Sequence, residues 1–93
     1  MSTSYLILLR PTVDREDFTK YWDSVRPTDD WFYMMPNSIF ITTDLTSRQI
    51  SELIMKKYGN IDHVVTKVTK DTWGWAVEEY WKRMKPYPGG SST

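Results

Sequence analysis

The hydrophobic positions of this chain alternate between short apolar runs and amphipathic stretches. Four runs have the length and the β-branched or aromatic content of strands, namely residues 5–9, 31–35, 38–43 and 63–69. Pro11 follows the first run and excludes its continuation as a helix. The second and third runs flank Pro36 and Asn37, which are typical of a tight turn, so we expect a hairpin. One long strand bent at Pro36 is the alternative.

Two stretches carry apolar residues at helical spacing. Asp14 can cap a helix that ends at Val25, and its predicted apolar face comprises Phe18, Tyr21, Trp22 and Val25. Thr46 and Gln49 form the pattern of a capping box at the start of a second helix, which Gly59 ends. The predicted buried stripe of this helix comprises Ile50, Leu53, Ile54 and Tyr58, and Leu45 with Ile50 forms a hydrophobic staple.

The last part of the chain concentrates tryptophan. The spacing predicts a third helix from Trp73, with a stripe made of Trp73, Val77, Tyr80, Trp81 and Met84. We expect Trp73 and Trp81 in the core, whereas Trp75 falls off this stripe and is the best candidate to face a partner. Residues 1–85 are expected to form one domain, and the Pro- and Gly-rich residues 86–93 a disordered tail.

The resulting order is β-α-β-β-α-β followed by an aromatic helix. This order predicts an α+β fold of the ferredoxin-like type, which is a four-stranded antiparallel sheet with helices on one face. Both faces of three strands are apolar, whereas a solvated face would be polar at alternate positions. Either the C-terminal aromatic segment or a second subunit must therefore cover the second face, or both do so. We expect a homodimer with Trp75, Tyr5, Trp31 and Tyr33 as partner-binding residues.

Composition excludes several classes of protein. The 93 residues contain no cysteine and a single histidine, so a disulfide scaffold and a thiolate metal site are excluded and no metal or cofactor is expected. No apolar run reaches the length of a membrane span and no signal peptide is recognised, which favours a cytoplasmic protein. The net charge is zero, with an excess of three acids in residues 1–46 and of three bases in residues 47–93. Electrostatic attraction to nucleic acid is therefore weak.

Few residues offer chemistry. Asp44, Asp62 and His63 could form an acid–base group, but turn and cap positions explain both carboxylates, and we assign no catalytic residue. Arg10, Lys67 and Lys70 could join sheet aromatics in a surface for single-stranded nucleic acid. The third strand, however, is aliphatic at Ile39 and Ile41, where RNA-recognition domains place stacking rings.

Several segments together resemble a known family. The stretch Trp31–Asp44, the helix 46–58, the strand 64–68 and the ending Trp73-Gly74-Trp75…Trp81 are similar to SinR-like proteins. These are small ferredoxin-fold proteins related to the small endoribonuclease-fold subunit of CRISPR adaptation. The resemblance spans roughly residues 5–84 and rests on pattern and aromatic placement. It implies a ferredoxin-like fold and a homodimer joined through sheets or edge strands.

The resemblance does not extend to catalysis. The CRISPR subunit has a metal-binding aspartate at the end of its first strand, where this chain has Arg10 and Pro11. A guanidinium would repel Mg²⁺, so metal-dependent cleavage is not expected. The sequence thus favours a non-enzymatic, homodimeric interaction module, and the resemblance implies a link to a CRISPR or phage-defence context. The alternatives are a nucleic-acid-binding or degenerate nuclease relative, and a dimeric α+β-barrel enzyme for a small molecule.

Overall fold

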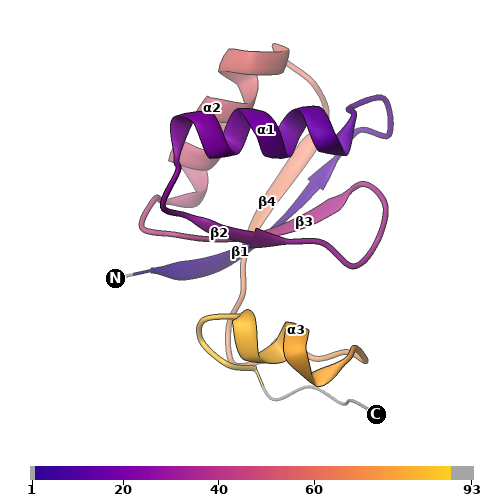
Figure 1. Ribbon diagram of the computed structural model, residues 1–93, viewed down its shortest axis with the longest axis vertical. Helices are drawn as coiled ribbons and strands as arrows, with labels where there is room; N and C mark the ends of the chain where they lie inside the picture. Colours follow the sequence, from indigo (N-terminus) through magenta and orange to yellow (C-terminus); the bar gives the residue numbers. More distant parts are fainter. Residues whose placement is uncertain (1, 89–93) are drawn as a thin grey trace.

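Four strands and three helices follow one another in the computed structural model, which describes residues 2–88. They are β1 (Thr3–Leu9), α1 (Arg15–Val25), β2 (Asp30–Phe32), β3 (Ser38–Thr43), α2 (Ser47–Tyr58), β4 (His63–Lys67) and α3 (Glu78–Arg83). The strands form one antiparallel sheet in the order β2-β3-β1-β4. Helices α1 and α2 lie on one side of the sheet and α3 lies on the other (Figure 1). The predicted α+β class with an antiparallel sheet is confirmed.

The first face of the sheet packs against α1 and α2. Ile7 of β1 lies opposite Ile39 of β3 and Val65 of β4, so alternate residues of the three strands share this face. The buried core on this face contains Tyr5, Ile7, Leu9, Phe18, Trp22, Ile39, Ile41, Ile50 and Ile54. Val25, which the helical spacing placed in the core, is exposed at the last residue of α1. The buried face of α1 therefore ends at Trp22.

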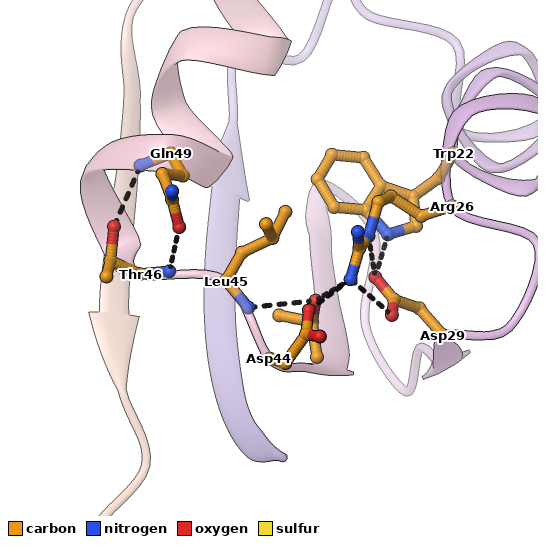
Figure 2. Close-up of polar contacts among 8 residues, drawn as sticks. Trp22, Arg26, Asp29, Asp44, Leu45, Thr46 and Gln49 are labelled. Carbon is orange, nitrogen blue, oxygen red and sulfur yellow. Dashed lines mark hydrogen bonds and ion pairs between the residues drawn. The ribbon is translucent and has the colours of Figure 1, made fainter. Parts of the chain in front are cut away.

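The helix starts follow the sequence closely. The side chain of Asp14 accepts a hydrogen bond from the backbone N–H of Glu16 at 3.2 Å and caps α1. Thr46 Oγ1 accepts from the N–H of Gln49 at 3.2 Å, and Gln49 Oε1 accepts from the N–H of Thr46 at 2.9 Å (Figure 2). This reciprocal pair is the predicted capping box, which is confirmed.

Replacing Thr46 with alanine should cost about 1 kcal/mol of stability, because the Gln49 N–H loses its side-chain acceptor. Urea unfolding followed by circular dichroism measures the difference. Ser47→Ala is the matched control, since Ser47 is exposed in the first turn of α2 and is not the N-cap residue. Equal stability of the Thr46→Ala variant and the native chain would contradict this helix start.

Both hairpin strands are present, but β2 is shorter than predicted. It pairs with β3 only from Asp30 to Phe32. The carbonyl of Met35 accepts hydrogen bonds from the backbone N–H and the hydroxyl of Ser38 and from the Arg15 guanidinium, so it serves the turn instead of the ladder. Asn37 adopts φ 65°, a left-handed conformation that asparagine tolerates in turns.

Strand β4 also ends early, at Lys67 instead of Thr69. The N–H of Thr69 donates to Thr72 Oγ1 at 3.0 Å, and the N–H of Thr72 donates to the carbonyl of Thr69. These local hydrogen bonds close a turn after Val68. The turn directs the C-terminal segment, which comprises residues 72–88, across the second face of the sheet (Figure 1).

The C-terminal segment covers part of the second face, but its helix differs from the prediction. Helix α3 begins only at Glu78. Trp73 is 72% exposed, so the predicted core position of Trp73 is wrong. Before α3 the chain alternates with a period of two: Trp73, Trp75 and Val77 are exposed, whereas Ala76 is buried. Gly74 lies against the Trp81 ring, where a Cβ would be 3.5 Å from it. Gly74 and Ala76 therefore face the interior, and the indoles of Trp73 and Trp75 face solvent.

A second buried cluster joins α3 to the sheet. It contains Phe32, Phe40, Val68, Ala76, Trp81 and Met84. The rings of Phe32 and Phe40 stack at 5.1 Å, and Arg83 pairs with Asp30 at 2.8 Å beside them. The segment is also tied to β1, because the N–H of Ser4 donates to the carbonyl of Lys85 at 2.8 Å.

The predicted tail, residues 86–93, is described only as far as Pro88, which is buried. Residues 89–93 lie outside the described part of the chain. Tyr87, between the two described prolines, is exposed.

Candidate functional site: an apolar surface on the second sheet face

Part of the second sheet face remains uncovered and apolar. Five large apolar side chains are 45–72% exposed on it or beside it: Leu8, Met35, Val64, Trp73 and Trp75. We call these five residues the second-face surface. Leu8 and Val64 are paired neighbours in the sheet, and Met35, Trp73 and Trp75 line one hollow, so none of them is an isolated exposed apolar side chain.

The register of the sheet explains how the second-face surface arises. Leu6 lies opposite Phe40 and Thr66, and Leu8 lies on the same face about 7 Å further along β1, opposite Ser38 and Val64. The row that contains Leu6 and Phe40 borders the C-terminal segment. The row that contains Leu8 and Val64 extends beyond that segment, so its apolar side chains meet solvent.

A hollow of about 270 Å³ lies between the C-terminal segment and the sheet. Met34 and Met35 line one part of it, and Trp73 and Trp75 line another, with Leu6, Phe40, Trp81 and Met84 among the other lining residues. Its walls are therefore mainly apolar, and flexible methionine side chains can adapt to different contact shapes. The hollow joins the two exposed indoles to the sheet row that contains Leu6 and Phe40.

The four predicted partner-binding residues do not lie together. Trp75 belongs to the second-face surface, but Tyr5 is only 7% exposed in the core under α1 and α2. Trp31 packs against that core, and its indole N–H donates to Asp23 at 2.8 Å. Tyr33 stacks on Trp31 at 6.1 Å and holds the Arg15 guanidinium over its ring at 3.4 Å. Tyr5 and Trp31 therefore face the helices, away from Trp75.

Four residues of the second-face surface were not predicted as site residues. Strand alternation places Leu8 and Val64 on the second sheet face. Their exposure follows only from the structure, in which the C-terminal segment stops short of their row. A helical period predicts Trp73 in the core, but the chain is not helical before Glu78 and Trp73 is exposed. No sequence pattern predicts whether Met35 is exposed or buried, because it lies after the end of β2, outside the alternation of a strand.

The basic residues divide into two places. Arg10 pairs with Asp62 at 2.9 Å, where β1 and β4 meet. Lys67 lies at the other end of β4, roughly 16 Å from Asp62 along the strand. Lys67 and Lys70 line a groove that Lys85 also lines. Arg10 therefore does not belong to the same site as the two lysines.

The acidic and histidine candidates are also separated. Asp44 binds Arg26, and Asp62 binds Arg10. His63 Nε2 lies 2.6 Å from Ser51 Oγ, and His63 Nδ1 lies 2.8 Å from the carbonyl of Ile61. A proton on Nδ1 would satisfy both contacts, with the serine hydroxyl donating to Nε2. Within residues 2–88, no group of three or more His, Asp or Glu side chains is arranged to hold a metal ion.

The strongest polar network lies at the end of α1, away from the second-face surface. The Arg26 guanidinium donates to Asp29, Thr43 and Asp44, and the indole N–H of Trp22 also donates to Asp29 (Figure 2). The hydrogen bond to Asp29 raises the pKa of Arg26 above its ordinary value, so this side chain stays charged. Burial raises the pKa of Tyr58, which donates to Asp17 at 2.8 Å. The first network joins the end of α1 to the end of β3, and the second joins α2 to α1.

No family model, curated protein or solved structure matches this chain. None of the three helices in residues 2–88 is long and apolar enough to cross a membrane.

Proposed function

We propose that the protein is a non-enzymatic interaction module that forms a homodimer through the second-face surface. The observation that carries this proposal is the exposure of two neighbouring indoles, Trp73 and Trp75, on an apolar hollow that Leu6 and Phe40 of the sheet also line. Tryptophan in contact with water is costly, and buried tryptophan is overrepresented among the residues that dominate binding energy. A second copy of the chain offers the same apolar surface, so a two-fold contact would cover both.

The outer edge of β4 supports the same arrangement. The N–H of Arg10 donates to the carbonyl of Asp62, and the N–H of Val68 donates to the carbonyl of Ser4. The backbone N–H and C=O groups of the even-numbered residues of β4 therefore point toward β1. Those of His63, Val65 and Lys67 point outward, away from β1. The strand is rich in β-branched residues and has no proline, which leaves it open to pairing with another strand. Val64 of the second-face surface lies on this edge strand.

We further propose that the fold is ferredoxin-like and that the chain is related to SinR-like proteins. The strand order β2-β3-β1-β4, with α1 and α2 on one face, supports the first part. The relation suggests a role in a CRISPR or phage-defence context, as a partner-binding protein without nuclease chemistry. The position of Arg10 at the end of β1 supports the absence of that chemistry, because a guanidinium there would repel a metal ion.

Disruption of the second-face surface should weaken self-association while the fold is kept. The double variant Trp73→Ala/Trp75→Ala should raise the dimer dissociation constant at least about tenfold, because each indole loses its buried contact. Val64→Ser should have a smaller effect of the same sign. Size-exclusion chromatography with light scattering over a micromolar concentration series measures the dissociation constant.

Val25→Ser is the matched control, because Val25 is a similarly exposed valine on α1, away from the second-face surface. It should leave association unchanged. A native chain that stays a folded monomer at all concentrations would refute the dimer. A dimer that tolerates the double tryptophan variant would place the contact elsewhere.

A further inference from the structure

We infer that the groove between the end of β4, the start of β1 and the segment at Lys85 binds a phosphate group. The groove has a volume of about 420 Å³ and is lined by Ser2, Thr3, Lys67, Val68, Thr69, Lys70, Lys85 and Pro86. Three lysines and three residues with hydroxyl side chains therefore line one space. This set provides positive charge and hydrogen-bond donors, which together bind phosphate oxygens.

Backbone hydrogen bonds bring the three lysines together. The N–H of Val68 donates to the carbonyl of Ser4 at 2.9 Å, which fixes the end of β4 against β1. The N–H of Ser4 donates to the carbonyl of Lys85, and the N–H of Lys85 donates to Ser4 Oγ, both at 2.8 Å. Ser4 is fully buried, so these bonds lie on a rigid part of the sheet. Lys85, distant in sequence, is thereby held beside Lys67 and Lys70.

The charge of the groove is not balanced by acids. No aspartate or glutamate lines it, and the ion pairs found among residues 2–88 involve none of the three lysines. The remaining lysines outside the groove are spread over α1, α2 and α3, and Lys82 of α3 pairs with Glu78. Three like charges around one groove repel each other, and an anion between them removes that repulsion.

Thr69 adds a directional donor. Its Oγ1 accepts a hydrogen bond from the N–H of Asp71 at 3.2 Å, so its hydroxyl hydrogen is left to donate elsewhere. Asp71 itself does not line the groove. A phosphate in the groove would meet the charged lysines and this hydroxyl, whereas chloride offers no comparable set of acceptor oxygens. Phosphate should therefore be preferred over chloride.

Titration of the ¹⁵N-labelled full chain with inorganic phosphate, followed by NMR, tests this site. We expect saturable shifts of the backbone signals of residues 67–70 and of Lys85, which sodium chloride at the same ionic strength does not produce. Lys70→Gln and Lys85→Gln should each weaken phosphate binding about threefold to tenfold, because each removes one charged donor. Neither change removes a backbone bond that holds the groove. Lys56→Gln is the control, since Lys56 is an exposed lysine on α2, and it should leave the affinity unchanged.

A second arm separates the sources of the phosphate group. Binding of a ten-nucleotide deoxythymidine oligomer that inorganic phosphate displaces would support the site and identify a nucleic-acid backbone as its ligand. Phosphate binding without oligomer binding would support the site and identify small phosphorylated molecules. Shifts that never saturate or that chloride reproduces, or an equal loss in Lys56→Gln, would overturn the proposal.

None of the five residues of the second-face surface lines the groove. The double variant Trp73→Ala/Trp75→Ala should therefore bind phosphate as the native chain does. Loss of self-association and loss of phosphate binding are thus measured separately, and failure of one leaves the other in place.

Discussion

The Trp81→Ala variant should lose about 3–5 kcal/mol of stability, whereas Trp73→Ala should lose no more than about 0.5 kcal/mol. Trp81 is 3% exposed in the second buried cluster and Trp73 is 72% exposed. Removal of the Trp81 indole would leave a cavity beneath the C-terminal segment and take away the ring that Gly74 contacts. A domain of this size has a total stability of roughly 5–15 kcal/mol, so the loss would be a large part of it.

Urea unfolding monitored by circular dichroism compares the two variants. Should Trp81→Ala fail to fold, Trp81→Phe leaves a smaller cavity and should keep a measurable, reduced stability. Equal losses in Trp81→Ala and Trp73→Ala would mean that both indoles are core residues, as the helical spacing predicted. Such a result would also remove Trp73 from the second-face surface.

Replacing Arg26 with methionine should cost about 2–4 kcal/mol, the second largest effect that we expect. The side chain of Asp29 is only 5% exposed and that of Arg26 is 26% exposed, so the variant would leave a nearly buried carboxylate without its cation. Asp44 and Thr43 would lose a donor as well (Figure 2). The indole N–H of Trp22 would remain as a donor to Asp29, which keeps the loss below that of a fully isolated charge.

Arg48→Met is the control for this substitution. Arg48 pairs with Glu52 on the surface of α2, and both side chains are mostly exposed, so its loss should cost less than about 0.5 kcal/mol. A double variant that adds Asp29→Asn to Arg26→Met should lose less than the sum of the two single variants, because the residues share one interaction. Equal stability of Arg26→Met and Arg48→Met would show that the network contributes little.

Local signals predicted most of the elements. The capping box at Thr46 is read from two residues three positions apart, and the cap of α1 at Asp14 requires one residue before an amphipathic run. These features depend on atoms within one turn of chain. Strand ends were less accurate, because the turn that closes β4 uses hydrogen bonds of Thr69 and Thr72, which compete with the ladder.

The candidate site was predicted less well than the fold. Trp75 was identified because it falls off a helical stripe, although the chain is extended there and the exposure has a different cause. Tyr5 was expected on a partner-binding surface, yet α1 and α2 cover it. Lys85 gave no signal at all, since its place beside Lys67 depends on hydrogen bonds to Ser4 at the opposite end of the sequence.

The sequence by itself determined the α+β class, the two capped helices and the apolar character of both sheet faces, because periodicity and caps are properties of neighbouring residues. Only the tertiary structure decided which apolar residues stay exposed. Trp73 and Trp81 look alike in a helical pattern, but the inward positions of Gly74 and Ala76 turn the first indole to solvent and leave room for the second. Whether a side chain is buried depends on which segment packs against its face of the sheet. Contacts between residues distant in the chain determine that packing.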